Sequence, residues 1–258
     1  MVKLSKRLTA VASMVCQDQI LADVGTDHGY IPIYLMEQGR ITGAIALDIG
    51  KGPLERAKEH IKMSGMGDYI QTRLSDGLAA LQVGEVQSIV VAGMGGGLVI
   101  HILEEGRKVA QAVEELILQP QSELEKVRDY LRENGYTVEA EDMVFEDGKY
   151  YPMMRVRYTG KVTEDKRITA LREQMKEQMH LDEAQIEGIF ARYGAGLLAE
   201  KNATLFAYLQ KEQHTYQVIL ENLKGQPSSA NILERQKEMQ EKMLQNEQAG
   251  SLFERNEG

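Results

Sequence analysis

Short apolar segments alternate with amphipathic segments through the first 160 residues of the chain. This alternation predicts a parallel β-sheet covered by helices, because strands buried on both faces are apolar throughout, whereas a covering helix is apolar on one side. The expected strands are 20–24, 44–48, 69–74, 88–92 and 116–119. The expected helices between them are 31–38, 53–64, 98–105 and 122–134.

Two further strands are expected at 136–145 and 150–158. Residues 146–149 (EDGK) separate them, and the Asp-Gly step in this segment favours a hairpin turn. Five parallel strands followed by an antiparallel pair predict an α/β fold with a Rossmann-like, doubly wound sheet. In such a sheet, ligands bind at the carboxyl ends of the strands, where the strand order reverses.

The strand pattern ends near Thr163, and apolar residues then recur at steps of three, four and seven. Residues 225–229 (GQPSS) interrupt this helical spacing and predict an antiparallel, coiled-coil-like helical hairpin. We therefore expect two domains, 1–160 and 161–258, with a frayed tail after about Gln245. The apolar positions are Leu171, Met175 and Met179 in a preceding helix, then Leu205, Leu209, Tyr216, Ile219, Leu223, Ile232, Met239 and Met243.

Composition narrows the class of protein. The chain has 258 residues, of which 43% are hydrophobic and 27% charged, as in folded soluble proteins. Its one cysteine, Cys16, excludes an intrachain disulfide and a cysteine-based zinc cluster. No segment approaches the roughly 20 consecutive apolar residues that span a bilayer, and residues 1–15 resemble a helix of the fold rather than a signal peptide. We expect a cytoplasmic protein with no metal site and no membrane contact.

The formal net charge of −9 argues against a protein that coats nucleic acid without specificity, because such binding depends on many Lys and Arg contacts to phosphate. A negative net charge is nevertheless compatible with a local basic surface. The sequence contains two basic clusters. The first is Lys3, Lys6 and Arg7, and the second is Arg155, Arg157, Lys161, Lys166 and Arg167. For each cluster taken alone, solvated surface charge is the favoured interpretation.

The turn after the first expected strand carries the strongest chemical signal. Residues 23–30 read DVGTDHGY, and the glycines allow the backbone to approach a ligand closely. The Gly-x-Gly-x-x-Gly spacing of dinucleotide sites is absent, and Asp27 would repel a diphosphate. S-adenosyl-L-methionine instead carries a cationic ammonium and sulfonium, which carboxylates stabilise. The residues assigned to a site for this methyl donor are Asp23, Gly25, Asp27, His28 and Gly29.

Acidic residues also follow the next two strands. Asp48, followed by Ile49, lies 23 positions after Gly25, where a carboxylate can accept hydrogen bonds from both hydroxyls of a ribose. Asp76 and Gly77 follow the third strand, where the carboxylate can meet the amino group of adenine. Each acid alone is more often a turn or capping residue, but acids at three successive strand ends favour one shared cofactor site.

The fourth strand ends in a glycine-rich segment, residues 92–97 (AGMGGG). Many amino-methylating enzymes of this architecture carry Asn/Asp-Pro-Pro-aromatic here, and the amide and ring hold the target amine. This segment supplies neither, although it leaves room for a flat base. A tight turn with close helix–sheet packing explains the spacing equally well. We take Gly93, Met94 and Gly95, together with Asp27, as the residues that line the reaction centre.

Several short segments match a known family. They are 4–8 (LSKRL), 27–32 (DHGYIP), 92–96 (AGMGG), 118–120 (LQP), 146–150 (EDGKY), 196–198 (GLL) and 200–202 (EKN). Together they resemble the bacterial tRNA (adenine-22-N1)-methyltransferase family over nearly the whole chain. Gly29 stands where alanine is common in that family, and Gln121 stands where asparagine is expected.

The resemblance implies a class I methyltransferase that transfers a methyl group from S-adenosyl-L-methionine to N1 of adenine 22 in tRNA. Adenine N1 keeps its lone pair at neutral pH, so the reaction needs alignment and desolvation rather than an obligatory general base. N1 lies on the pairing edge, so the base must leave its stack before it reacts.

Individual residues take provisional roles from this chemistry. Tyr30 is a candidate to stack on the extruded base, although a core position fits it slightly better. His28 is expected to be a turn or donor-contacting residue, and the remaining histidines ordinary surface residues. The protein is expected to act as a monomer. The first candidates for tRNA contacts are Lys3, Lys6, Arg7 and Lys149.

The residues alone leave two other functions open. A methyltransferase of the same fold acting on a small molecule or a protein would work without RNA and without strong salt dependence of substrate binding. A noncatalytic RNA-binding protein would keep the pocket without turnover. Calorimetric titration with S-adenosyl-L-methionine distinguishes the noncatalytic protein from both enzymes, and methyl transfer to unmodified tRNA distinguishes the two enzymes.

Replacing Asp27 with alanine tests the role assigned to its carboxylate. We expect D27A to lose most methyl transfer while still folding, because the charge that orients the donor and stabilises the developing adenine cation is removed. Turnover is measured with labelled donor and folding by circular dichroism. Near-wild-type methylation by a folded D27A variant would refute the assignment.

Overall fold

The computed structural model describes residues 2–225 and 229–254. The chain divides between Glu164 and Asp165 into two compact units, close to the predicted boundary at 160. The first unit holds a β-sheet with helices, and the second is helical. Residues 226–228 of the predicted break lie outside the described residues.

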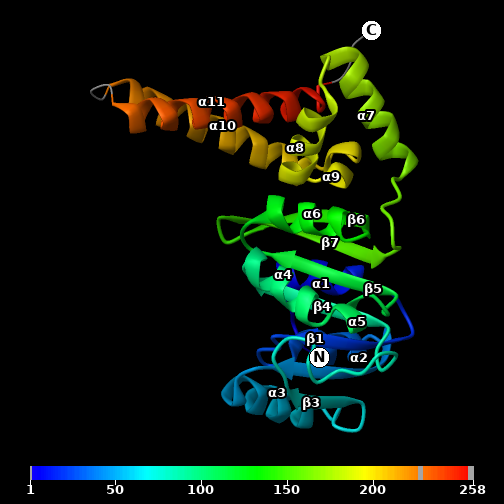
Figure 1. The fold of residues 1–258 in the computed structure, drawn as a ribbon. Helices are drawn as coiled ribbons and strands as arrows, with labels where there is room; N and C mark the ends of the chain where they lie inside the picture. The colour runs from blue at the N-terminus through cyan, green and yellow to red at the C-terminus, as the bar shows by residue number, and fades with distance from the viewer. Residues whose placement is uncertain (1, 226–228, 255–258) are drawn as a thin grey trace. The chain divides into compact units, whose positions relative to one another are not determined.

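A seven-stranded sheet forms the centre of the first unit, in the order β3-β2-β1-β4-β5-β7-β6 (Figure 1). β1 to β5 pair in parallel, and β7 pairs antiparallel with both β5 and β6, so the predicted Rossmann-like α/β fold is confirmed. The order reverses where β1 lies beside β4. The strands are β1 (Gln19–Val24), β2 (Ile41–Asp48), β3 (Ile70–Leu74), β4 (Ser88–Met94), β5 (Glu115–Pro120), β6 (Tyr136–Glu146) and β7 (Lys149–Tyr158).

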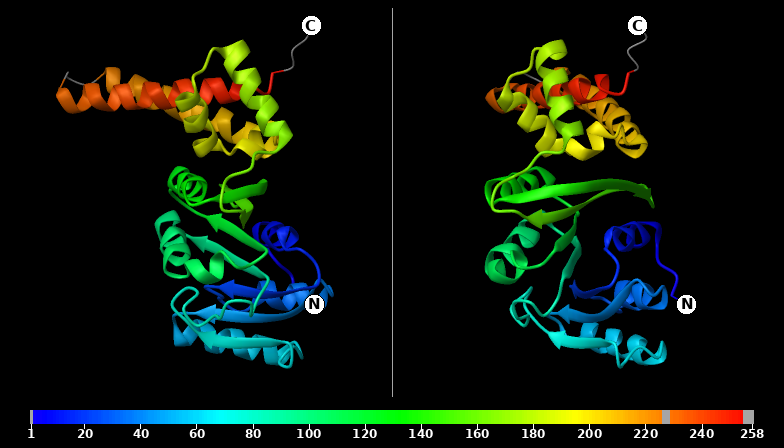
Figure 2. Two further views of the ribbon diagram at one scale, coloured as in Figure 1. Left: turned by 45° about the vertical axis from the view of Figure 1, so that its right-hand side comes forward. Right: turned by 90° about the vertical axis from the view of Figure 1, so that its right-hand side faces the viewer.

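Helices cover both faces of this sheet (Figure 2). One face packs against α1, α2 and α3 through residues such as Val11, Leu35 and Ile61. The other face packs against α4, α5 and α6. The predicted helices are confirmed, and the four-residue α5 is an addition that the pattern does not predict. The helices are α1 (Lys6–Met14), α2 (Tyr30–Glu37), α3 (Lys51–Met63), α4 (Gly96–Glu105), α5 (Arg107–Ala110) and α6 (Leu124–Glu133).

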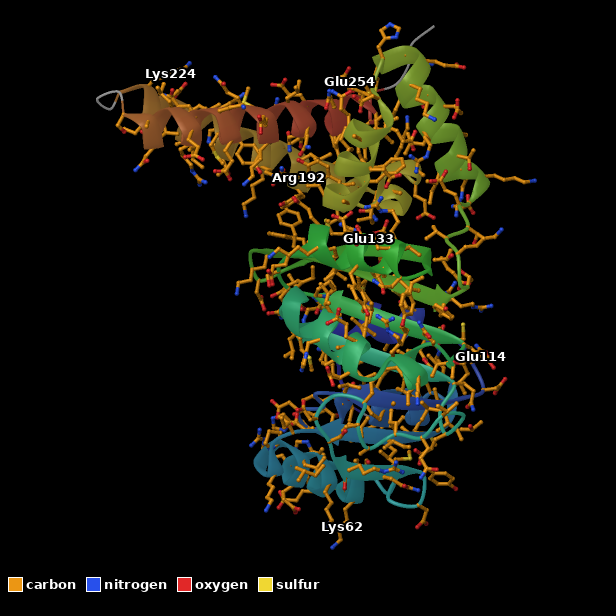
Figure 3. All side chains as sticks on the ribbon, in the orientation of Figure 1. Lys62, Glu114, Glu133, Arg192, Lys224 and Glu254 are labelled. Atoms are coloured by element: carbon orange, nitrogen blue, oxygen red, sulfur yellow. The ribbon has the colours of Figure 1, made fainter. Side chains whose placement is uncertain are left out.

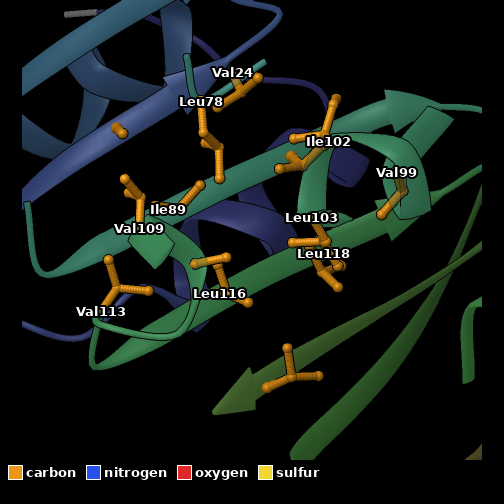
Figure 4. Packing of buried hydrophobic residues seen from close by; sticks show 14 of the residues in the cluster. Val24, Leu78, Ile89, Val99, Ile102, Leu103, Val109, Val113, Leu116 and Leu118 are labelled. Atoms are coloured by element: carbon orange, nitrogen blue, oxygen red, sulfur yellow. The ribbon is translucent and has the colours of Figure 1, made fainter. Parts of the chain in front are cut away.

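Aliphatic side chains fill the space between the sheet and α4 (Figure 4). Ile89 of β4 and Leu116 and Leu118 of β5 are fully buried there, as are Val99 and Leu103 of α4. All residues of β5 are buried, because a parallel strand at the centre of the sheet is covered on both faces. This double coverage explains why the apolar runs in the sequence are continuous rather than alternating.

The second unit is built from α7 to α11. α10 and α11 run antiparallel and pack through Tyr216, Leu220 and Met239, as the helical spacing predicts. α8 and α9 are additions to the predicted elements. None of the described helices is both long and apolar enough to cross a membrane. The helices are α7 (Lys166–Met179), α8 (Glu183–Tyr193), α9 (Ala195–Ala199), α10 (Ala203–Lys224) and α11 (Ala230–Ser251).

The prediction of a frayed tail after Gln245 is wrong. α11 continues to Ser251, and Asn246, Ala249 and Leu252 are buried. The Asn246 amide donates to the Leu209 carbonyl of α10 at 3.1 Å, which fixes this end of the helix. A polar residue with a buried backbone partner is indistinguishable, in the sequence, from a polar residue in solvent.

A buried carboxylate, Glu212, joins α8, α10 and α11. Arg192 of α8, labelled in Figure 3, lies 3.3 Å from it. Burial alone raises the pKa of Glu212, but the hydrogen bond with Tyr216 and the attraction to Arg192 more than offset this and hold the pKa below its usual value. The other hydrogen-bond donors are Tyr193 at 2.8 Å, Tyr208 at 2.9 Å and Asn246 at 3.1 Å.

The lowered pKa makes the stability of the helical unit depend on pH. The Glu212 contribution is present above the unfolded-state pKa and disappears as pH falls through the lower folded-state pKa. We expect Glu212→Gln to lower the free energy of unfolding by about 3 kcal/mol at pH 7, and the difference from wild type to shrink as pH falls through the acid range. Urea unfolding at both ends of this range measures the difference.

Glu241→Gln is the matched control, because Glu241 lies on α11 with 65% of its side chain exposed. We expect its effect to stay below about 0.5 kcal/mol at every pH. A Glu212→Gln deficit that is the same at neutral and acidic pH would contradict the role of the charge.

Candidate active site

The carboxyl ends of β1 to β4 meet at one edge of the sheet. Val24 of β1 pairs with Leu47 of β2 on one side and with Val91 of β4 on the other. Asp48, the last residue of β2, pairs with Leu74, the last residue of β3. The turns that follow these strands therefore leave the sheet side by side, and the acids predicted at three strand ends share one edge.

Asp23 is the most buried acid of this group, with 6% of its surface exposed. Burial raises the pKa of its carboxyl to about 6; the Thr26 hydroxyl acts in the opposite direction, and the nearby Asp48 raises the pKa further. Two carboxylates held close together, one of them out of water, favour a cation between them. The edge is therefore suited to a positively charged ligand.

Gly25 lies at the point where the strand order reverses. The amides of Gly25 and Thr26 both donate to the Leu47 carbonyl, at 2.8 and 2.9 Å. A Cβ on Gly25 would lie 2.1 Å from Cε of Met94, so the methionine side chain rests directly against the turn after β1. The structure thus brings two predicted site segments, on β1 and β4, into contact.

The remaining predicted cofactor residues lie along the same edge. Oδ1 of Asp48 accepts from the Gly50 amide at 2.6 Å, which is the turn role expected for an isolated acid. Ile49 is 70% exposed, and Asp76 is exposed beside Gly77 at the end of β3. Their placement agrees with one shared site, and their contacts with a cofactor stay a prediction.

Asp27 has a partner that the sequence does not predict. Its carboxylate lies 2.8 Å from the Arg56 guanidinium of α3 and 3.4 Å from Nε2 of His28, with 60% of the side chain exposed. Its negative charge is therefore partly balanced in this structure. Arg56 and His60 stand four residues apart on one face of α3, and this spacing is the sequence signal that could have placed them together.

Three aromatic rings stack beside Asp27. His28, Tyr30 and His60 have ring centroids 5.0 to 5.4 Å apart and planes within 20° of parallel. Tyr30 is 37% exposed, so the core position that the sequence slightly favours is wrong, and so is the assignment of His60 to ordinary surface. His28 has φ +72°, a left-handed conformation that is uncommon outside glycine and frequent at functional sites.

The glycine-rich segment serves two purposes. Gly93 has φ +80° and lies where the pairing of β4 with β5 shifts register, so it forms a bulge at the exposed edge. Gly96 instead packs closely, because a Cβ there would lie 2.5 Å from the Ser122 carbonyl oxygen. Gly96 thus fits the interpretation of a tight turn, whereas an open site at Gly93 stays a prediction.

A second group of residues lies beyond Gly93 and includes two of the segments that carry the family resemblance. Arg7 of α1 donates from Nη1 to Oε1 of the buried Gln119 at 2.8 Å, and its guanidinium lies 5.5 Å from the centre of the Tyr151 ring. Glu146 accepts from the Lys6 and Arg7 amides, which ties α1 to the β6–β7 hairpin. The motifs at 4–8 and 146–150 are thus adjacent in space.

No group of three or more His, Cys, Asp or Glu residues that could hold a metal ion is found in residues 2–225 and 229–254. The acids at the edge lie at separate strand ends, and Asp27 and Asp48 have the partners given above. Their arrangement suits an organic cation that extends along the edge.

Comparisons with known proteins agree with this geometry. A protein-family model described as a methyltransferase domain matches residues 4–154. A tRNA (adenine(22)-N(1))-methyltransferase from Bacillus subtilis (strain 168) is 34% identical over 242 residues, which are 93% of this chain and 94% of the relative. The chain belongs to the TrmK family of tRNA methyltransferases.

Solved structures of TrmK proteins share the fold of nearly the whole chain. The crystal structure of the Bacillus subtilis m1A22 tRNA methyltransferase TrmK matches with a TM-score of 0.79 and 30% identity, covering 97% of this chain and 100% of that one. Sp1610 from Streptococcus pneumoniae, a candidate tRNA (m1A22) methyltransferase in complex with S-adenosyl-L-methionine, matches with a TM-score of 0.77 and 32% identity, covering 96% and 100%.

Substitution of two adjacent glycines tests the close packing of α4. We expect Gly96→Ala to lower the free energy of unfolding by about 1–3 kcal/mol, because its methyl group would overlap a backbone carbonyl that cannot rotate away. In Gly97→Ala the methyl group meets only the end of the Glu123 side chain, at 3.1 Å. This control should be neutral or gain up to about 1 kcal/mol, since alanine favours helix over glycine. Equal urea midpoints for the two variants would contradict the packing role.

Proposed function

We propose that this protein transfers a methyl group from S-adenosyl-L-methionine to N1 of adenine 22 in tRNA. The observation that carries the proposal is the buried carboxylate of Asp23 beside Gly25 and Met94, at the point where the strand order reverses. Ligands bind at this point in open α/β sheets, and the charge there selects a cation. Membership of the TrmK family supports the tRNA substrate.

The residues at the edge fit the methyl donor. Asp23 and Asp27 supply negative charge for its ammonium and sulfonium, and Asp48, at the end of β2, is the residue proposed to accept hydrogen bonds from its ribose. Nδ1 of His28 is buried and has no hydrogen-bond partner among the described residues, so a polar ligand group can satisfy it. The donor supplies an electrophilic methyl carbon bound to a positively charged sulfur.

The chain's own residues then have to align the acceptor and exclude water. The N1 lone pair forms the new bond to the methyl carbon as the carbon–sulfur bond breaks, and the positive charge passes from sulfur to the adenine. No proton has to be removed first, so a general base is not required. The Asp27 carboxylate remains the group proposed to stabilise the adenine cation, now with Arg56 setting its position.

Basic residues near Gly93 offer a surface for the tRNA backbone. Lys6 donates from Nζ to the Phe145 carbonyl at 3.2 Å, Arg7 reaches Gln119, and Lys149 pairs across the hairpin with Glu146. Lys6, Arg7 and Lys149 therefore gather where α1 meets the β6–β7 hairpin, which supports them as phosphate contacts.

The later basic cluster is a weaker candidate. Arg155 and Arg157 lie 3.7 and 3.1 Å from Glu139, so this carboxylate offsets part of their combined charge. Arg167 pairs with Asp165 and Glu200 in the second unit. This arrangement fits surface charge that is balanced locally, as the sequence suggests for either cluster alone.

We also propose a monomeric enzyme, as expected from the sequence, and a cytoplasmic one, because tRNA substrates are found in the cytoplasm. Two alternatives make different predictions: a small-molecule or protein methyltransferase needs no RNA, and a noncatalytic RNA-binding protein shows no turnover.

Methyl transfer to matched tRNA transcripts tests the proposal. The full chain is incubated with labelled donor and with transcripts that carry adenine or guanine at position 22 and are otherwise identical, followed by nucleoside analysis. We expect 1-methyladenosine from the adenine transcript and at least a hundredfold less product from the guanine transcript. Equal labelling of both transcripts, or none of either, would overturn the proposed function.

A further inference from the structure

The end of β4 lacks a side chain that could recognise the target base. There is no side-chain amide, hydroxyl or ring in residues 92–95 (AGMG). Gly93 is exposed, and a Cβ there would meet only the ends of two side chains, Nη1 of Arg7 at 3.6 Å and Nε2 of Gln121 at 3.8 Å. Gly93 is therefore exposed and free of close backbone contacts, and the polar groups nearest to it come from other elements.

Gln121 brings an amide to this space from the neighbouring strand. It follows β5 directly, and its backbone amide donates to the Met94 carbonyl at 2.8 Å, which fixes its position beside the end of β4. The residue is exposed. Within the described part of the chain, no hydrogen bond involves its side chain, so both the carbonyl and the amino group are available to a ligand.

Gln119, two residues earlier, is in the opposite situation. Its side chain is fully buried, with Oε1 accepting from Arg7 and Nε2 donating to the Pro120 carbonyl at 3.3 Å. It holds Arg7 in place and has no amide group left for a substrate. Of these two amides next to Gly93, Gln121 is therefore the one able to contact a base.

The geometry of the reaction limits which edge of adenine can be recognised. N1 must face the methyl donor, so the pairing edge is occupied by the reaction itself. The neighbouring edge offers N7 as an acceptor and the second N6 hydrogen as a donor. A glutamine amide matches this pair with two hydrogen bonds, whereas guanine offers acceptors at both N7 and O6.

We propose that Gln121 recognises the target adenine through N6 and N7 and thereby sets specificity for adenine. The side-chain carbonyl accepts from N6, and the amino group donates to N7. Related architectures carry a side-chain amide after the fourth strand. In this protein, Gln121 supplies that amide from the position after the fifth strand. This inference rests on the proposed function.

A cycle that combines protein and substrate changes tests the contact. Wild type, Gln121→Ala and Gln121→Met are compared on tRNA containing adenosine or 7-deazaadenosine at position 22, which lacks only the N7 acceptor. We expect both variants to lose about 10- to 100-fold in kcat/KM on adenosine. Wild type should lose about 10-fold on 7-deazaadenosine, whereas the variants should not distinguish the two substrates by more than about twofold, because the N7 contact is already gone.

Gln17→Ala is the matched control, because Gln17 is an exposed glutamine just before β1, at the opposite end of that strand. Its kcat/KM and its sensitivity to 7-deazaadenosine should equal those of wild type. Donor affinity, measured by calorimetry, should be unchanged in all variants, because Gln121 contacts the base alone.

Three results would overturn the role of Gln121. They are variant rates within twofold of wild type, an undiminished 7-deazaadenosine effect in the variants, and weakened donor binding. Wild-type enzyme that fails to methylate adenosine 22 at all would instead remove the proposed function, and the inference with it. The wild-type assay on adenosine 22 therefore distinguishes failure of the proposed function from failure of the Gln121 role before any variant is compared.

Discussion

Parallel pairing of β1 with both β2 and β4 is the constraint on which the rest of the structure depends. A parallel register places the carboxyl ends of neighbouring strands at the same edge, so segments distant in sequence must leave the sheet together. Val24 pairs with Leu47 and Val91, and Met94 consequently covers Gly25. Burial of the aliphatic strands on both faces maintains this register, because a shift of one residue would move every side chain to the opposite face and disrupt its packing against the covering helices.

That edge concentrates negative charge in a poorly solvated place. Asp23 is held at the end of a buried strand, where losing water raises the pKa of its carboxyl. Asp27 is exposed and already paired with Arg56. Burial of the Asp23 carboxylate is thus unfavourable, and a bound cation can relieve this cost. Asp27 lies at the surface, where its side chain can adjust its position. Fold stability and ligand affinity are linked at Asp23, since the core that holds the sheet together also removes water from this carboxylate.

The side of the site proposed to hold the adenine is assembled from several elements. Each of them contributes only one or two residues. A bulge exposes Gly93, β5 supplies Gln119, the residue after β5 is Gln121, and α1 supplies Arg7. Glu146 holds the start of α1 against the β6–β7 hairpin, so an element early in the sequence depends on one much later for its position. In the proposed function, recognition of the base, which other methyltransferases place on one short motif, is distributed over several strands and a helix.

Much of this protein follows from the order of its residues. Apolar periodicity determines the strands, most of the helices and the antiparallel final pair, because burial on one or both faces leaves a direct record in the sequence. Acids at the ends of β1, β2 and β3 likewise predict which edge of the sheet binds a ligand. Only the tertiary structure decided that Arg56 faces Asp27, that His60 stacks on His28, that Asn246 is buried, and that Gln121 borders Gly93. Contacts of this kind join side chains from different elements, and their formation depends on distances and angles that the packing of the whole unit sets.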